Sequence, residues 1–427
     1  MGLLSQDGGL ASVITPIAYG SLLLFGSTAM TLPTEKKTLL KNGRVIDPAS
    51  GFDAIANVLV VDGKIAAVGA AAGAEVADAE VIDVSGCLVT PGLIDIHTHC
   101  FVGLGDFCLP ADMMGVHSGV PVIVDAGTAG ATIFGLARRA VIDHPDTKTK
   151  VLAFMDPCQI YLANKGYICH QLEIAADLRN LDPEVTLEAL EANRDVIVGF
   201  KVRATYTDNP KVSPFLEMAK EIGKDLPIMI HLGTFPHTPV IDYHDLLDAL
   251  RPGDIITHAF RGGGGQLDAK GEPTPQFISA VERGVVLDIG HSGGDFHIPT
   301  ALRLMERGFR PNTISTDLNV FNVDGPVFSM STTMTKIWAL GASLTEVISM
   351  NTVGAAAAIR KSHEYGTLGI GRSAEVSVLR IEEGDFVLTD GHETMRTDQR
   401  LRAVGCLRAG EWFDATHDRI RMLEAAE

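Results

Sequence analysis

The chain has 427 residues, of which 46% are hydrophobic and 21% are charged, a composition typical of a globular protein with a large core. Its formal net charge is −18. An acidic surface repels nucleic acid and anionic lipid, so we expect neither nucleic acid nor a membrane as a partner. The charge is compatible with a small-molecule substrate, and the sequence leaves homo-oligomer formation open.

The N-terminal segment differs from the rest of the chain. Residues 10 to 25 form an apolar stretch that Pro16 and Gly20 interrupt, and this stretch is short for a membrane span. It also lacks the preceding positive charges of a secretory signal. We therefore expect residues 1–35 to be an extension outside the fold, either a leader or a start-site artefact. The six cysteines show no Cys-x-x-Cys spacing, which favours free thiols and a cytoplasmic protein, although the apolar stretch leaves export open.

Two zones, one towards each end of the chain, are rich in short β signals. Asp62 and Gly63 have the character of a hairpin turn between two strand runs. The clearest strand runs of both zones are Val58–Val61, Lys64–Val68, Glu375–Leu379 and Ala403–Leu407. We expect residues 36–90 and 361–427 to pair as one small β-sandwich domain built from both chain ends.

Residues 91–360 alternate short apolar runs with helical stretches, which indicates a parallel sheet with helical crossovers. The strand candidates are Leu93–His99, Val120–Gly127, Lys150–Asp156, Val196–Arg203, Ile228–Gly233, Asp254–Phe260, Val285–His291 and Thr313–Asn319. The clearest helices are Thr186–Asn193, Ser213–Ile222, Thr274–Arg283 and Ile298–Arg307. Eight strands with intervening helices predict an α/β fold, a (β/α)8 TIM barrel. An open doubly wound sheet is the alternative, but the run Gly262–Gly265 follows the sixth strand and has no nucleotide-binding pattern.

Polar side chains gather at the carboxyl ends of these strand candidates, where barrel active sites are built. His97 and His99 end the first strand, and side chains two residues apart share one face of a strand. Lys201 and Arg203 end the fourth strand with the same spacing. The later strand ends carry His231, His258, His291 and Asp317. Imidazole and carboxylate groups are ligands that suit zinc or a similar divalent ion.

Lys201 needs a separate explanation, because an ammonium group is costly inside a cavity and is repelled by divalent cations. Addition of CO2 to its neutral amine gives a carbamate with two anionic oxygens, one for each of two cations. We therefore predict a metal-binding TIM barrel with a two-metal centre that this carbamate bridges. The predicted ligands are His97, His99, Lys201, His231, His258 and Asp317.

Each of these residues has a plainer alternative. A single strand-end histidine is usually a polar cap, and a single strand-end lysine usually reaches towards solvent. Arg203 is a candidate for binding a substrate carboxylate through two parallel hydrogen bonds, and its alternative is a structural ion pair inside the barrel. His291 is a candidate for stabilising an oxyanion or contacting the substrate, and its alternative is a hydrogen-bonded strand-end histidine.

Several stretches resemble the amidohydrolase superfamily. Thr90–His99 resembles the opening barrel strand of these enzymes, Gly366–Val376 their re-entry into the small β domain, and Lys41–Asp47 its first strand. The stretches Phe200–Arg203, Leu287–Gly294 and Ser315–Leu318 look most like the amidohydrolase/deacetylase branch, often called dihydroorotase-like. This resemblance implies hydrolysis of N-acyl or O-acyl groups next to a carboxylate. It also implies the ligand set above, with Lys201 carboxylated and Asp317 as proton shuttle.

The expected function is that of a metal-dependent deacetylase that cleaves an amide or ester of a small carboxylic acid. A hydroxide that bridges the two metals is expected to attack the carbonyl, with Asp317 and Lys201 as catalytic residues and Arg203 and His291 as substrate contacts. A cyclic amidohydrolase of the dihydroorotase or hydantoinase type is the alternative. Phe101 stands where dihydroorotases carry an arginine. A lyase or isomerase on the same scaffold, or a non-catalytic binding module, would be separated by product analysis and by metal content.

Overall fold

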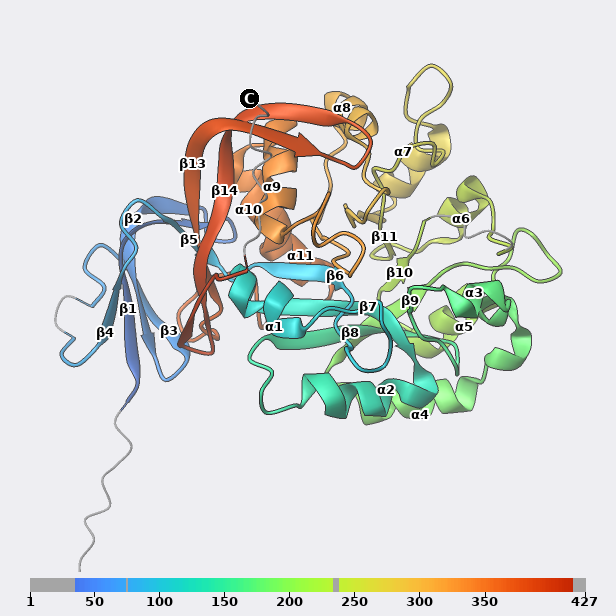
Figure 1. Ribbon diagram of the computed structural model, residues 1–427, viewed down its shortest axis with the longest axis horizontal. Coiled ribbons are helices and arrows are strands. Elements are labelled where there is room, and N and C mark those ends of the chain that lie inside the picture. Colours follow the sequence, from blue (N-terminus) through green and yellow to red (C-terminus); the bar gives the residue numbers. More distant parts are fainter. Residues whose placement is uncertain (1–34, 74–75, 233–237, 418–427) are drawn as a thin grey trace, which may run out of the picture. The chain divides into compact units, whose positions relative to one another are not determined.

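The computed structural model describes residues 35–73, 76–232 and 238–417 (Figure 1). The extension predicted for residues 1–35 therefore lies, except for Glu35, outside the described residues. From Lys36 onward the chain forms one unit that contains two β-sheets. Among the described helices, none combines the length and the apolar character that crossing a membrane requires.

The first sheet has eight strands and draws them from both ends of the chain. They are β1 (Lys37–Asp47), β2 (Phe52–Val61), β3 (Lys64–Gly69), β4 (Glu80–Asp83), β5 (Leu88–Pro91), β13 (Val376–Thr389), β14 (Thr394–Arg408) and β15 (Glu411–Asp414). The strand order is β15-β14-β13-β5-β1-β2-β3, and β4 pairs with β1. Hydrogen bonds run through all eight strands, so the predicted β domain built from both chain ends is one continuous sheet. The predicted hairpin turn joins β2 to β3, with positive φ at Asp62 and Gly63.

The second sheet has seven parallel strands in the order in which they follow one another along the chain. They are β6 (Ile94–Thr98), β7 (Val122–Gly130), β8 (Lys150–Asp156), β9 (Ile197–Val202), β10 (Ile228–Ile230), β11 (Ile255–Ile256) and β12 (Val286–Leu287). Nearly all of their residues are buried, as expected for a parallel sheet that is covered on both faces. Each of the first seven predicted barrel strands therefore has a counterpart, although Gly233 at the end of the fifth lies outside the described residues.

The prediction of an eighth regular strand, Thr313–Asn319, is wrong. Residues 313–319 instead make single parallel bridges to both ends of the second sheet, from Thr313 to Asp288 and from Leu318 to Thr98. Asp317 has a φ of +54°, a left-handed conformation that interrupts extended geometry. Its backbone N–H nevertheless donates to the His97 carbonyl at 2.7 Å, so this segment connects the two edges of the seven-stranded sheet.

Helices alternate with the barrel strands as the sequence predicts (Figure 1). They are α1 (Ala111–Met114), α2 (Ala131–Ala137), α3 (Ile168–Gln171), α4 (Pro183–Ala192), α5 (Pro214–Gly223), α6 (Tyr243–Ala249), α7 (Pro275–Glu282), α8 (Ile298–Glu306), α9 (Met330–Ala339), α10 (Leu344–Asn351) and α11 (Val353–Ala358). The four predicted helices correspond to α4, α5, α7 and α8. A proline near the start and a capping side chain explain where α4 and α5 begin, since the Asp182 carboxylate accepts from the Glu184 N–H and the Ser213 hydroxyl from the Leu216 N–H.

Candidate metal centre

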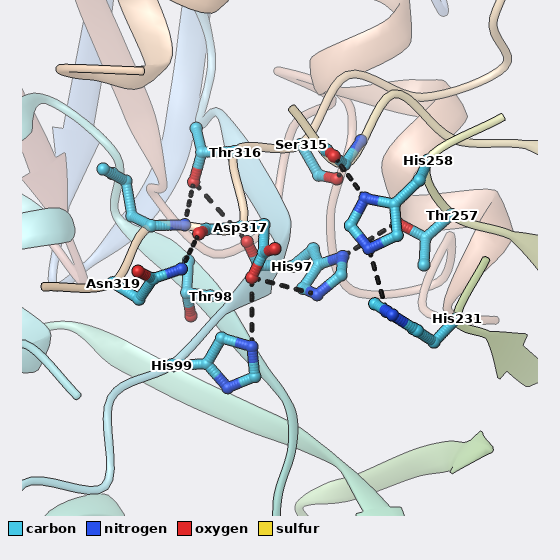
Figure 2. Close-up of polar contacts among 12 residues, drawn as sticks. His97, Thr98, His99, His231, Thr257, His258, Ser315, Thr316, Asp317 and Asn319 are labelled. Carbon is cyan, nitrogen blue, oxygen red and sulfur yellow. Dashed lines mark hydrogen bonds and ion pairs between the residues drawn. The ribbon is translucent and has the colours of Figure 1, made fainter. Parts of the chain in front are cut away.

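The six predicted ligands converge at the carboxyl ends of the barrel strands, and Figure 2 shows all of them except Lys201, which contacts His97. His97 lies in β6 and His99 just beyond it, Lys201 lies in β9, and His231 and His258 follow β10 and β11. Asp317 lies in the segment that connects the two edges of the sheet. Five of the six side chains are buried and that of His231 is half-buried, so strands far apart in sequence build one enclosed polar site.

Asp317 lies between His97 and His99 (Figure 2). Its Oδ1 atom is 3.0 Å from His99 Nε2 and 3.3 Å from His97 Nε2. These three atoms lie within 4.8 Å of one another, as ligands of one ion do. Burial raises the pKa of the Asp317 carboxyl, but its contact with His99 and the surrounding positive charge outweigh burial and hold this pKa below its ordinary value.

A second group of donors lies beside this triad. His258 Nε2 is 3.1 Å from His231 Nδ1, so one ring nitrogen of each residue faces the other. Lys201 Nζ donates to His97 Nε2 at 2.9 Å and therefore lies against the first group. Burial lowers the pKa of Lys201 to about 7, so near neutral pH much of this lysine carries the unprotonated amine that can add CO2.

Buried carboxylates behind the histidines fix which ring nitrogen faces the centre. Thr257 donates its hydroxyl to Asp288 at 2.8 Å and accepts from His97 Nδ1 at 2.8 Å. Thr128 has the same role for His99: its hydroxyl donates to Asp125 Oδ2 at 2.8 Å and accepts from His99 Nδ1 at 2.7 Å. Both Nδ1 atoms therefore carry the proton, which leaves both Nε2 atoms with a lone pair directed at the centre.

His258 is oriented by the backbone. Its Nδ1 donates to the Gly290 carbonyl at 2.5 Å, so its Nε2 is unprotonated and its lone pair is directed towards His231. His258 and Asp317 both have left-handed backbone conformations, with φ of +59° and +54°. Such conformations are costly for residues with side chains, and they concentrate at functional sites where the surrounding fold maintains them.

The position of the Lys201 side chain requires a glycine at residue 127, in strand β7. Gly127 has a φ of +72°, and a Cβ atom at this position would lie 2.4 Å from Lys201 Cβ. No side chain larger than hydrogen fits there without moving the lysine. The position of the Lys201 stem therefore follows from the residue at position 127 as well as from its own strand.

The donor set fits divalent metal ions. Asp317 Oδ1 is buried and has no hydrogen bond from any described residue, although two imidazole nitrogens lie beside it. Three histidine nitrogens have lone pairs facing the same space, and hydrogen bonds from the other side of each ring hold them there. A carboxylate oxygen and imidazole nitrogens held from behind by further hydrogen bonds are what zinc and related ions bind in proteins.

A cavity of about 500 Å³ opens above this centre. His97, His99, Lys201, His231 and Asp317 are among the residues that line it. The rest of its described lining is Phe107, Tyr161, Leu162, Ala163, Asn164, Tyr167, His170, Arg203, Arg261, Ser292, Gly293, Gly294, Asp295, Asn319 and Phe321. A volume of this size accommodates a small organic molecule.

The two predicted substrate contacts lie in different surroundings. Arg203 lines the cavity, but its Nη1 donates to Asp156 Oδ2 at 2.6 Å and its guanidinium lies 3.9 Å over the Tyr161 ring. His291 is fully buried and is not part of the described cavity lining. Its Nε2 accepts from Lys336 Nζ at 2.7 Å. Both placements favour the structural alternatives, an ion pair for Arg203 and a hydrogen-bonded histidine for His291.

Sequence reasoning missed several residues of the cavity wall. Arg261 and Asp295 follow β11 and β12, and Tyr161 follows β8. Arg261 stands immediately before the glycine run at 262–265, so its place beyond a barrel strand was a usable signal. Sequence reasoning also did not pair Asp156, which ends β8, with Arg203, which directly follows the neighbouring strand β9.

A parallel barrel sheet whose strand ends carry four histidines, a lysine and an aspartate around one cavity defines the class of metal-dependent hydrolases. No protein-family model matches the chain. It is 33% identical over 359 residues to a protein named deacetylase from Brucella anthropi, across 82% of this chain and 85% of that protein.

Two solved structures are similar in fold. One is described as an adenine deaminase, with a TM-score of 0.78, 28% identity, and coverage of 89% of this chain and 100% of that one. The other is described as a dihydroorotase, with a TM-score of 0.77, 28% identity, and coverage of 89% and 99%. The chain belongs to the amidohydrolase superfamily, in its amidohydrolase/deacetylase branch, and its general function is that of a metal-dependent amidohydrolase.

Proposed function

We propose that the protein is a deacetylase-type hydrolase that cleaves the amide or ester bond of a small N-acyl or O-acyl carboxylic acid. The observation that carries this proposal is the position of Asp317, whose buried carboxylate lies between two histidines at the floor of a cavity of small-molecule size. The deacetylase relative supports the same type of bond.

Two divalent ions, zinc or similar, would be held by the six convergent side chains. His97, His99 and Asp317 form one group of donors, His231 and His258 form the other, and Lys201 as a carbamate would join them. When bound, such ions activate the scissile carbonyl and the attacking water. Burial of Lys201 supports the carbamate, because modification replaces an enclosed ammonium with the anionic group that two cations require.

Asp317 is the residue best suited to move the proton. If Oδ1, which lies beside the two histidine nitrogens, binds a metal ion, the second carboxylate oxygen remains to accept a proton from the attacking water. Because its pKa is held below the ordinary value, the carboxyl is ionised at neutral pH and returns the proton readily to a departing amine or alkoxide. Asn319 and Asn322 both donate to the Asp317 carbonyl, at 2.8 and 2.7 Å, and hold its left-handed backbone in place.

The cyclic amidohydrolase alternative receives less support. Phe101 is fully buried and packs edge-on against Phe134, with 6.2 Å between the ring centroids. It is not part of the described cavity lining. The position that carries an arginine in dihydroorotases therefore offers no cation to a substrate in this chain.

The proposal is tested by a hydrolysis screen on metal-loaded protein. N-acetyl amino acids and O-acetyl 2-hydroxy acids, both enantiomers of each, are incubated with the enzyme, and released acetate is measured. Dihydroorotate and hydantoins serve as the comparison set. Acetate release with clear enantiomer preference is expected. Opening of the cyclic compounds without acetate release would favour the alternative function.

A further inference from the structure

We propose that Arg261, rather than Arg203, binds the carboxylate of the substrate. This inference rests on the proposed function, because it concerns the acid group of an acylated acid. Both arginines line the cavity above the metal centre, so position alone does not distinguish them. The groups with which they pair do distinguish them.

Arg203 is already neutralised. Its Nη1 donates to Asp156 Oδ2 at 2.6 Å, and the exposed fractions of the two side chains are 9% and 4%. The flat face of its guanidinium is stacked on the Tyr161 ring. A substrate carboxylate would have to approach beside the buried Asp156 charge, and like charges in such a site repel each other strongly.

Arg261 has hydrogen-bonding capacity that the described residues leave unused. Its Nε is buried and has no hydrogen-bond partner among the described residues. Its ion pair with Asp295 joins Nη2 to Oδ1 at 3.5 Å, longer than a well-formed charged hydrogen bond, and the two side chains are 25% and 22% exposed. A loose, partly exposed pair of this kind contributes little, so a substrate carboxylate can take its place.

The loop that carries Arg261 is held by its own hydrogen bonds. The Arg261 N–H donates to the His258 carbonyl at 3.2 Å, which ties the arginine to a predicted metal ligand. Gln266 Nε2 donates to the Ala259 and Arg261 carbonyls, at 2.9 and 3.1 Å. A Cβ on Gly264 would lie 2.8 Å from Arg261 Cγ, so this glycine leaves the room that the arginine stem occupies. These contacts hold the Arg261 backbone, three residues beyond the predicted ligand His258.

The test compares each acylated acid with its own primary carboxamide. N-acetyl amino acids and O-acetyl 2-hydroxy acids are assayed with metal-loaded wild type, Arg261→Met, Arg203→Met and the matched control Arg303→Met. Arg303 pairs with Glu272 and is not part of the described cavity lining. Binding of the same compounds is measured by calorimetry in the Asp317→Asn background, where turnover is expected to be slow. The preference for the acid over the carboxamide can therefore be measured as a ratio of affinities even when no hydrolysis occurs.

We expect Arg261→Met to lower the acid-to-carboxamide ratio of kcat/KM and of affinity by about 10–150-fold, and Arg303→Met to leave it at the wild-type value. Arg261→Lys should recover part of the ratio, because lysine restores the charge but not the paired hydrogen bonds. An unchanged ratio in Arg261→Met, or wild-type binding without preference for the acid, would overturn the inference. Absence of turnover with retained acid preference would instead refute the proposed function and leave the role of Arg261 standing.

Discussion

Replacement of Thr257 by valine should weaken metal binding while preserving the barrel. Valine has the shape of threonine but lacks the hydroxyl group. In the structure this hydroxyl accepts from His97 Nδ1 and donates to Asp288, each at 2.8 Å. Its removal frees the His97 ring to rotate or to move its proton to the nitrogen that faces the centre, and either change removes a metal ligand.

The expected magnitude follows from the loss of the hydrogen bond between His97 Nδ1 and the Thr257 hydroxyl. Removal of such a bond behind a metal ligand lowers metal affinity by about 10–100-fold, or about 1.4–2.7 kcal/mol. Asp288 keeps two other donors, the hydroxyls of Thr313 and Ser315, both at 2.7 Å. Because its carboxylate stays hydrogen-bonded, the free energy of unfolding should fall by only about 1 kcal/mol.

The assay is a competition titration of zinc against a chelator, with thermal unfolding of the metal-free protein measured in parallel. Thr186→Val is the matched control, since Thr186 is also fully buried and donates its hydroxyl to the Pro157 carbonyl at 3.0 Å, outside the centre. The control should lose stability without losing metal affinity. Equal metal affinity in Thr257→Val and wild type would refute the assignment of His97 as a ligand oriented through this hydroxyl.

Two further predictions concern the metal centre, and a third concerns the buried side chain of Lys336. Lys201→Ala should lose bound metal and activity together, and added short carboxylic acids should restore part of both. Metal content is measured by elemental analysis and activity by turnover. Wild-type values of both in this variant would refute the carbamate bridge between the two metal ions. Asp317→Asn should lower kcat by about 10²–10⁴-fold while metal content falls less than in the histidine variants, and near-normal turnover would show that another group moves the proton. Burial lowers the pKa of Lys336 from 10.5 to about 7, so the unfolded chain binds a proton in this range that the folded chain has released. The free energy of unfolding should therefore fall as pH decreases from about 10 to about 7, and Lys336→Met should flatten this slope in urea titrations.

Much of the fold was predictable because strands and their polar ends leave local signals. Lys150–Asp156 is a strand with the predicted bounds, since an apolar run stops at a charged residue. His97 and His99 converge because the period of a strand places alternate side chains on one face, and the parallel sheet brings the other strand ends to the same edge. The predicted ligands therefore lie close together because they stand at the carboxyl ends of parallel strands in one sheet.

Other features depend on tertiary contacts that a single sequence does not reveal. The segment at 313–319 has the pattern of a strand, but the left-handed backbone of Asp317 is maintained by two asparagine side chains that follow it. Arg203 has the spacing of a substrate contact, and its engagement by Asp156 is set by the packing of two neighbouring strands. Arg261 lies beyond a strand end in a loop, where sequence periodicity gives no direction for a side chain.

The most direct test of a two-metal deacetylase is a titration of metal-free protein with zinc in the presence of bicarbonate, followed by acetate release from the best substrate of the screen. Metal bound per chain is measured in the same samples. We expect activity to rise with bound zinc up to two ions per chain and to disappear on chelation. Acetate release at full rate from metal-free protein, or none from any acylated acid at full metal occupancy, would contradict this mechanism.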